Sequence, residues 1–237
     1  MGLIVALHGL PTGPRLWERV TVPRGYHLIR PQVPGLGADG TPDDFSLEWA
    51  ATQLSQRWAT DEADVLMGHD MGGVLAAMLA QPGQKVVLSG TALGPYWSLI
   101  RMTAWPFFNR AFYHRYAGRT FLRRGCLPEH RETLLDAFAD HGPGWAERMR
   151  RIAMAMKPPR ALGLDLRRND VLLAWGRQDP WYPPFPVARA VAAACRGRLE
   201  LLEAGHFAPW EAPGGFSEAL AAFLPPPTER RTGDAAG

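Results

Sequence analysis

The segment Gly68-His69-Asp70-Met71-Gly72-Gly73 (GHDMGG) decides the fold, because it lies between an apolar strand-like run and an Ala/Leu/Met-rich helix-like stretch. It fits the pattern Gly-x-nucleophile-x-Gly, a sharp strand-to-helix turn that presents a reactive side chain, with Asp70 where serine is commonest. Small residues are needed on both sides of this turn, since a Cβ atom there would collide with neighbouring backbone. The N–H groups at the start of the helix would favour the ionised carboxylate. The alternative is a glycine-rich turn in which Asp70 caps the helix.

Short apolar runs alternate with helix-like stretches along the chain, which is typical of a parallel sheet covered by helices. Buried parallel strands are apolar on both faces, and six runs of this kind are predicted to be strands. They are residues 3–7, 27–29, 64–68, 85–89, 170–175 and 199–202. Helices are predicted near residues 45–59, 71–80, 184–195 and 213–224. The sequence therefore predicts an α/β fold with a mostly parallel sheet of about six strands.

Two later segments complete a candidate catalytic set. Trp175-Gly176-Arg177-Gln178-Asp179-Pro180 and Ala204-Gly205-His206-Phe207 each come just after a predicted strand. Taken singly, Asp179 is typical of a turn and His206 of an ordinary loop. A nucleophile, an acid and a histidine nevertheless occur in the order Asp70, Asp179, His206, each at the carboxyl end of a strand, where parallel sheets place ligands. Their order and places favour a catalytic triad.

The segment His8-Gly9-Leu10-Pro11 comes directly after the first predicted strand. In a protein with this kind of turn, the loop supplies one backbone N–H group of an oxyanion hole, and the residue after the nucleophile supplies the other. We therefore expect the two donors to be the N–H groups of Leu10 and Met71.

The stretch from residue 93 to residue 168 breaks the alternation of strands and helices. It contains aromatic residues at helical spacing, and 13 Arg and Lys157 against 6 acidic residues. We predict that it is a helical cap inserted between two strands, with its arginines on a solvated face. Residues 1–92 and 169–225 would then form the core, and residues 226–237 a flexible tail.

Composition narrows the class of protein. The chain has 237 residues, of which 46% are hydrophobic and 21% charged, so it can bury a large core and is not disordered as a whole. The net charge of +3 is too small to argue for a nucleic-acid partner. No secretory signal follows Met1, and no apolar run approaches the ~20 residues that span a bilayer. We expect a cytoplasmic protein without stable membrane association; the alternative is that the basic, aromatic stretch 97–124 lies on an anionic membrane or on nucleic acid.

Together these segments resemble the α/β-hydrolase superfamily, specifically its aspartate-nucleophile branch, which includes epoxide hydrolases and haloalkane dehalogenases. HGLPTGPRLW (8–17) is similar to that branch's oxyanion loop, RPQVPGLG (30–37) to the turn after the next strand, and GHDMGG to the nucleophile turn. LLAWGRQDPWYP (172–183) is similar to its acid loop and AGHFAPWEAP (204–213) to its histidine loop. The resemblance covers about residues 3–92 and 169–224 and implies an α/β-hydrolase fold with a helical cap.

Three departures from the family bear on the expectations. Members usually have two strands before the His-Gly motif, so the resemblance implies a sheet without these first two strands. The strand at 27–29 would then be an edge, which invites pairing with another chain in a homo-oligomer or cover by a loop. Haloalkane dehalogenases typically have Trp after the nucleophile, and dehalogenases acting on fluoroacetate have Arg, whereas this chain has Met71. Both absences weaken a dehalogenase assignment.

An aspartate nucleophile suits attack on a saturated carbon, because attack on an ester carbonyl would give an anhydride. The resemblance implies an epoxide hydrolase-like enzyme for a small apolar electrophile, with Asp70 opening the epoxide. His206, oriented by Asp179, would activate the water that hydrolyses the resulting ester. The candidates for contact with substrate, including the tyrosines that would protonate the opening oxygen, lie in the cap: Tyr96, Trp97, Tyr113 and Tyr116.

Other functions remain open from the sequence alone. A haloalkane dehalogenase, or a hydrolase or lyase that uses the three residues without a covalent intermediate, is one alternative. A ligand-binding protein without activity on the same scaffold is another, because a fold does not by itself confer activity. No metal or organic cofactor is expected, and Cys126 and Cys195 show no metal-ligand spacing.

Overall fold

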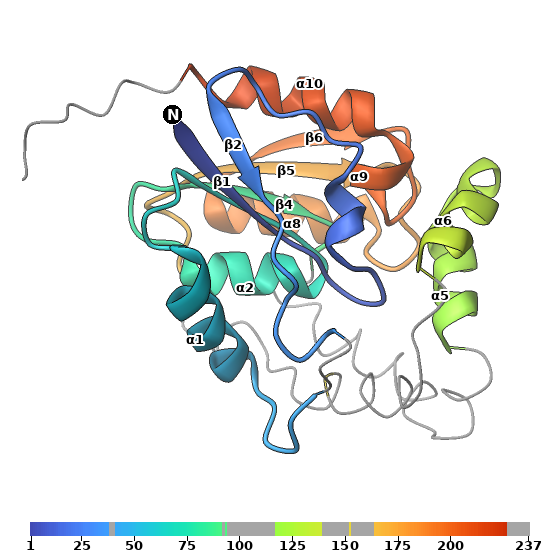
Figure 1. Cartoon of the computed structure of the whole chain (residues 1–237). Helices are drawn as coiled ribbons and strands as arrows, with labels where there is room; N and C mark the ends of the chain where they lie inside the picture. Colours follow the sequence, from blue (N-terminus) through green and yellow to red (C-terminus); the bar gives the residue numbers. More distant parts are fainter. Residues whose placement is uncertain (38–40, 92, 94–116, 139–151, 153–163, 227–237) are drawn as a thin grey trace, which may run out of the picture.

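The computed structural model describes residues 1–37, 41–91, 93, 117–138, 152 and 164–226 (Figure 1). At the centre of this part of the chain is a six-stranded parallel sheet in the order β2-β1-β3-β4-β5-β6. Its strands are β1 (Gly2–Leu7), β2 (Tyr26–Ile29), β3 (Val65–His69), β4 (Lys85–Ser89), β5 (Asp170–Gly176) and β6 (Arg198–Leu202). All six predicted strands are confirmed. As expected, the strand around residues 27–29 lies at an edge of the sheet.

Both faces of the sheet are buried, and β1 shows why its sequence is a continuous apolar run. Successive side chains of a strand point to opposite faces. Ile4 and Ala6 belong to one buried cluster, whereas Val5 and Leu7 belong to the other. None of the four has any exposed surface. An alternating apolar and polar pattern would leave polar groups unpaired under one of the two helical layers.

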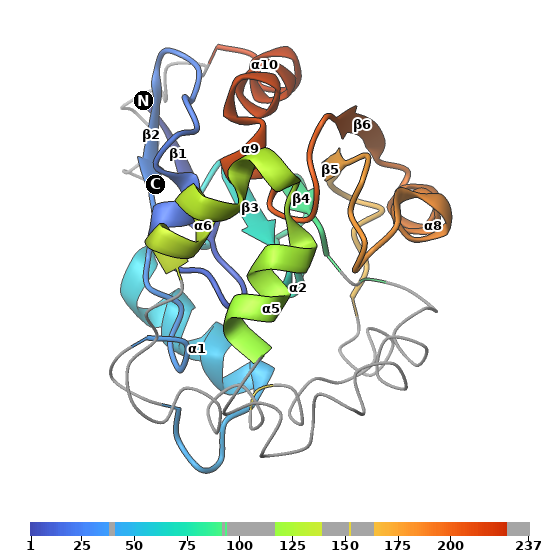
Figure 2. The same ribbon diagram turned by 90° about the vertical axis from the view of Figure 1, so that its right-hand side faces the viewer.

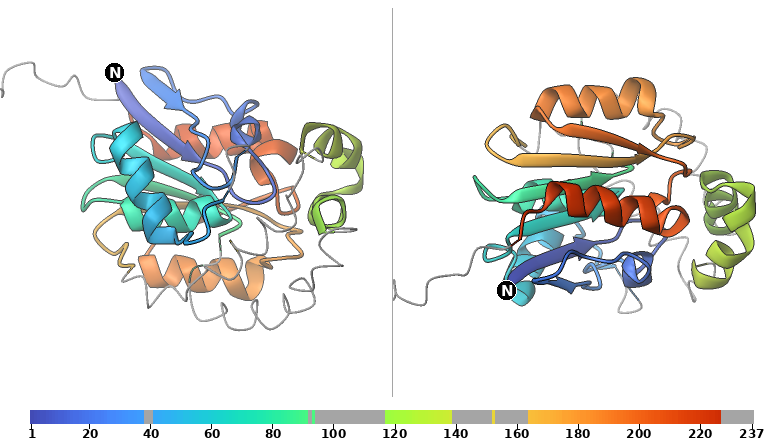
Figure 3. Two further views of the ribbon diagram at one scale, coloured as in Figure 1. Left: turned by 60° about the horizontal axis from the view of Figure 1, so that its bottom comes forward. Right: turned by 90° about the horizontal axis from the view of Figure 1, so that it is seen from above.

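Helices cover the two faces of the sheet as separate layers (Figures 1 and 3). One layer contains α1 (Leu47–Trp58), α2 (Met71–Leu79) and α8 (Arg189–Cys195). The other contains α10 (Pro213–Phe223) and two short helices, η1 (Pro14–Trp17) and α9 (Ala208–Glu211). None of the helices within the described ranges is long and apolar enough to cross a membrane.

A further helical segment comes between β4 and β5 in the chain. It consists of α5 (Ala117–Gly125), η3 (Pro128–His130) and α6 (Arg131–Phe138). These helices lie beyond the carboxyl ends of the strands, as Figure 2 and the right-hand view of Figure 3 show. The position fits a cap, but the boundaries predicted for the cap (93–168) and for the tail (226–237) remain predictions, because much of both segments lies outside the described residues.

The prediction of a single helix near residues 184–195 is wrong for the first turn of this segment. Phe185 has extended backbone angles (φ −118°, ψ 109°), so the segment divides into a distorted turn, η5 (Pro184–Ala188), and the regular helix α8. Phe185 precedes Pro186. Proline pushes the residue before it out of helical angles, because its ring would clash with that residue's backbone.

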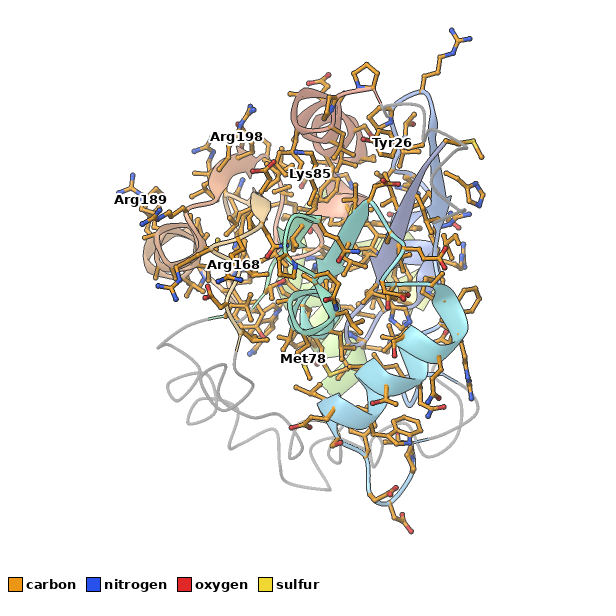
Figure 4. All side chains as sticks on the ribbon, turned by 90° about the vertical axis from the view of Figure 1, so that its left-hand side faces the viewer. Tyr26, Met78, Lys85, Arg168, Arg189 and Arg198 are labelled. Atoms are coloured by element: carbon orange, nitrogen blue, oxygen red, sulfur yellow. The ribbon has the colours of Figure 1, made fainter. Side chains whose placement is uncertain are left out.

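The amino ends of the strands carry charged surface residues, whereas the predicted triad follows the carboxyl ends. Figure 4 looks onto the amino ends of the strands, where Tyr26, Lys85 and Arg198 begin β2, β4 and β6. Lys85 Nζ lies 2.7 Å from Asp170 Oδ2, and Arg198 pairs with Glu200, so this end presents charged groups to solvent. The predicted triad residues and oxyanion donors follow the opposite, carboxyl ends of the strands.

Candidate active site

Asp70 lies on the sharp turn between β3 and α2, with φ 51° and ψ −121°. A positive φ is uncommon for a residue with a side chain, and strain of this kind is typical of turns that present a nucleophile. The glycines after it are required by close packing. A Cβ atom on Gly72 would collide with the carbonyl oxygen of Leu7, and one on Gly73 with the side chain of Thr91. The local sequence therefore permits β1, β3 and α2 to meet closely beneath the carboxylate.

The Asp70 carboxylate is almost fully buried and accepts one hydrogen bond on each oxygen. Its Oδ2 accepts from the backbone N–H of Leu10 at 3.1 Å, and its Oδ1 accepts from the hydroxyl of Tyr182 at 3.1 Å. The side chain makes no capping hydrogen bond to α2, so the capping alternative is wrong. The carboxylate is instead directed towards the loops that follow β1 and β5.

Opposing effects act on the pKa of Asp70. Burial raises it, because the ionised form loses contact with water. His206 lowers it, as do the backbone N–H groups of Met71 and Leu10 and the hydroxyl of Tyr182. Both backbone donors predicted for the oxyanion hole thus act on the carboxylate of Asp70 itself.

The loop that carries Leu10 is held by His8. The His8 ring is fully buried, and its Nδ1–H donates to the carbonyl oxygen of Gly9 at 3.1 Å. Its Nε2 accepts from the backbone N–H of Val33 at 3.1 Å, which links the loop after β1 to the loop after β2. A Cβ atom on Gly9 would lie 2.6 Å from Asp70 Cβ. The His-Gly pair therefore brings the backbone of this loop against Asp70.

His206 and Asp179 form a buried pair, with His206 Nδ1 2.9 Å from Asp179 Oδ2 and both side chains fully shielded from solvent. The other oxygen of Asp179 accepts from the backbone N–H groups of Trp181 and Tyr182, each at 2.9 Å. Burial alone would lower the pKa of His206, but the charge and hydrogen bond of Asp179 and the charge of Asp70 together raise it. With Nδ1 bound to Asp179, Nε2 is the nitrogen that can exchange a proton.

Glu211 fixes the loop that carries His206. This buried carboxylate accepts from the N–H of Phe207 at 2.9 Å, and from the N–H groups of Gly205 at 3.1 Å and Leu127 at 2.7 Å. The backbone N–H of His206 itself donates to the carbonyl oxygen of Gly125 at 2.6 Å. The histidine loop is thereby joined to the end of α5 and the residues that follow it, so this helix and the candidate base share one support.

The imidazole ring of His206 is packed on several sides. Ring centroids of His69, Tyr182 and Phe121 lie 4.7, 5.3 and 5.8 Å from that of His206. Gly90, at φ 50° after β4, leaves room for the ring, because a Cβ atom there would lie 2.9 Å from His206 Nδ1. Such packing restricts the imidazole to one orientation, as proton transfer at a set position requires.

A family model described as "Alpha/beta hydrolase family" matches residues 4–219. The chain belongs to the alpha/beta hydrolase family. The search of curated proteins found no significant match.

Solved structures show the same fold as this alpha/beta hydrolase. It is similar to a thermophilic esterase from Thermogutta terrifontis, with 20% identity and a TM-score of 0.75 over 94% of this chain and 89% of the other. It is similar to an enol-lactonase from Burkholderia xenovorans, with 19% identity and a TM-score of 0.70 over 94% and 91% of the two chains. MenH from S. aureus gives 20% identity and a TM-score of 0.71 over 94% and 93%. At these identities the structural similarity shows the fold, and it does not show to which branch of the family the chain belongs.

The structure brings most of the sequence-predicted site residues of this alpha/beta hydrolase together. Asp70, Asp179, His206, Leu10 and Met71 surround one place at the carboxyl ends of the strands. The candidates Tyr96, Trp97, Tyr113 and Tyr116 lie outside the described residues. Within those residues, no group of His, Cys, Asp or Glu side chains is arranged to hold a metal ion.

Two residues of the site were missed by the sequence analysis. Tyr182 lies three residues after Asp179 in the acid loop, and Glu211 lies in the histidine loop. Both stand inside segments that were singled out for other residues. A tyrosine beside prolines and a glutamate in a short helix carry no signal of their own, because each acts on a residue distant in the sequence.

Proposed function

We propose that this alpha/beta hydrolase opens small apolar epoxides through a covalent ester on Asp70. The observation that carries the proposal is the hydrogen bond of 3.1 Å from the Leu10 N–H to Asp70 Oδ2. One of the two expected oxyanion donors, the N–H of Leu10, thus holds an oxygen of the proposed nucleophile. When water attacks Cγ of an Asp70 ester, the negative charge develops on that same Oδ2, where a positioned donor is worth roughly 3–4 kcal/mol.

The first step uses the other oxygen of the carboxylate. Asp70 Oδ1 attacks a ring carbon of the epoxide, the carbon–oxygen bond breaks, and its electron pair passes to the released oxygen, which takes up a proton. The product is an alkyl ester, which is stable until water is activated. Attack on a carboxylic ester by the same group would give an anhydride, so a saturated carbon is the electrophile that suits an aspartate.

The second step uses the buried His206–Asp179 pair. His206 Nε2 takes a proton from water, and the resulting hydroxide attacks Cγ of the ester. The tetrahedral intermediate then collapses and releases a diol that carries Oδ1, with the proton returned from His206 to the departing oxygen. Asp179, 2.9 Å from His206 Nδ1, stabilises the imidazolium that forms in between.

The first test is the intact mass of a His206→Gln variant exposed to a panel of epoxides and haloalkanes. An opened epoxide adds its whole mass, whereas a haloalkane adds its mass less hydrogen halide, so one spectrum identifies the leaving group. We expect an epoxide adduct that maps to Asp70. The matched control is the same variant with Asp70→Asn as well, which should form no adduct.

Two results would overturn the proposal. One is the absence of an adduct across the panel, which would indicate a non-covalent reaction or a binding role. The other is an adduct that maps to a residue other than Asp70. A single wild-type turnover in ¹⁸O-water checks the second step independently, since the first diol should carry an unlabelled oxygen from Asp70 and the label should enter the carboxylate.

A further inference from the structure

Tyr182 contacts all three residues of the candidate triad. Its hydroxyl donates to Asp70 Oδ1 at 3.1 Å, and its backbone N–H donates to Asp179 Oδ1 at 2.9 Å. Its ring centroid lies 5.3 Å from that of His206. The side chain is buried, with 8% of the residue exposed. Nothing in the sequence distinguished this tyrosine from those of the cap.

The backbone of Tyr182 is anchored at both of its polar groups. The N–H is bound by Asp179, and the carbonyl oxygen accepts from Trp175 Nε1 at 2.8 Å. Trp175 is part of β5 and has no exposed surface. The hydroxyl is therefore presented by a rigid loop of the core, which is a requirement for a group that must act at a defined atom.

We infer that Tyr182 is the acid that protonates the oxygen released when Asp70 attacks, and that the substrate therefore leaves through an oxygen. The inference rests on the proposed function and assigns to the core a role that the family resemblance gave to the cap tyrosines. Oδ1 attacks from about 3–3.5 Å, and the leaving oxygen is bonded to the carbon under attack. A hydroxyl that lies 3.1 Å from Oδ1 is thus beside the place that the leaving oxygen takes.

The protons balance over the cycle. In the first step the Tyr182 O–H bond breaks, its proton joins the alkoxide, and Tyr182 is left as tyrosinate beside the neutral ester. In the second step one proton of water reaches the departing diol oxygen by way of His206. The other proton remains on the new carboxyl oxygen, which takes the place of Oδ1. That carboxyl group ionises and returns its proton to the tyrosinate, restoring both Asp70 and Tyr182.

Electrostatics supports the timing of this transfer. Burial raises the pKa of Tyr182 well above 10, and the charges of Asp70 and Asp179 raise it further, so the hydroxyl is protonated before the attack. During the attack the negative charge of Asp70 passes to the leaving oxygen. The resting hydrogen bond to Oδ1 weakens as a charged acceptor appears on the substrate, and the proton follows the charge.

The test compares two probes that differ in their need for a proton. Styrene oxide leaves an alkoxide on opening, whereas benzyl bromide releases bromide, which needs no proton. Both are applied to His206→Gln and to His206→Gln with Tyr182→Phe, and the rate of adduct formation on Asp70 is followed by mass. We expect the phenylalanine change to slow the epoxide adduct by roughly 10²–10⁴-fold, the usual contribution of a general acid, and to alter the bromide rate by less than about threefold.

Tyr26 provides the matched control. It lies on β2 at the opposite end of the sheet (Figure 4), and its hydroxyl donates to the carbonyl oxygen of Pro225 at 3.0 Å. Tyr26→Phe in the His206→Gln background should change neither rate. The bromide adduct also shows that the Tyr182→Phe variant folds with a competent nucleophile.

The remaining outcomes overturn the inference in distinguishable ways. An equal fall with both probes would show that Tyr182 only positions Asp70, and no fall with either would show that it has no part in the chemistry; the proposed function would survive both. Bromide adducts without epoxide adducts when Tyr182 is intact would exclude an oxygen leaving group. No adduct with either probe when Tyr182 is intact would overturn the proposed function together with the inference.

Discussion

The buried ring of His8 makes the folding free energy depend on pH. It is fully buried, donates through Nδ1–H to Gly9 and accepts at Nε2 from Val33, an arrangement that requires the neutral imidazole. Burial lowers the pKa of His8 from 6.5 to about 4, although hydrogen bonds with the backbone of Gly9 and Thr12 act in the opposite direction. Between these two pH values His8 is neutral in the folded protein and protonated in the unfolded chain.

The size and sign of the effect follow from the two pKa values. Because the unfolded state binds the proton first, the stability contributed by neutral His8 is fully present above pH 6.5. It is lost as the pH falls from 6.5 to about 4. Each pH unit within this window is worth about 1.4 kcal/mol, so the whole window is worth about 3 kcal/mol.

Urea unfolding of the wild type and of His8→Gln, followed by tryptophan fluorescence at several pH values, measures this contribution. The difference in unfolding free energy between the two should narrow by roughly 2–3 kcal/mol between about pH 7 and pH 4.5. Taking the difference largely cancels the carboxylates and the other buried histidines, His69 and His206, which are common to both. His27→Gln, at an exposed position on β2, should run parallel to the wild type. A constant difference between wild type and His8→Gln over this range would refute the reasoning.

Three further predictions concern the support of the base. Asp179→Asn should remove the group that raises the pKa of His206, so the acidic limb of the pH–rate profile for ester hydrolysis should move to lower pH, with Asp70 alkylation less affected. Single-turnover kinetics measure both steps, and an acidic limb that does not move would contradict this prediction. Glu211→Gln retains one acceptor oxygen for three backbone donors, so the free energy of unfolding should fall by about 2–4 kcal/mol. Urea titrations measure this fall, and a loss below about 1 kcal/mol would count against the assigned contacts. Gly90→Ala places a Cβ atom 2.9 Å from His206 at a positive φ, so we expect turnover to fall at least about tenfold; unchanged turnover would show that the ring has room to move.

The secondary structure was largely predictable from the sequence. A strand buried on both faces must be apolar throughout, and the run ends where the chain needs a turn, so β1 and β4 were located to within a residue. The failure at residues 184–195 had a local cause, because Pro186 forces Phe185 out of helical angles. Such errors come from covalent geometry that a periodic pattern ignores.

The meeting of the triad was also predictable, for a topological reason. Asp70, Asp179 and His206 each follow a strand, and the carboxyl ends of parallel strands share one edge of the sheet. The sequence order thus implied their proximity, and the distance of 2.9 Å between His206 Nδ1 and Asp179 Oδ2 agrees with it. The order of strands and loops thus predicts the edge of the sheet at which the backbones of these residues come together.

Only the tertiary structure decided which side chains complete the site. Tyr182 donates to Asp70 across 112 residues of chain, and Glu211 accepts from Leu127 across 84. A hydrogen bond requires its two heavy atoms within about 3 Å and correctly directed, which depends on strand register, loop path and rotamer together. Hydrophobic patterning determines which face of an element is buried, but it carries no information about where a hydroxyl or carboxylate at the end of a loop will point. The sequence by itself therefore determined the scaffold and the location of the candidate site, and the packing of distant loops determined the groups that surround Asp70.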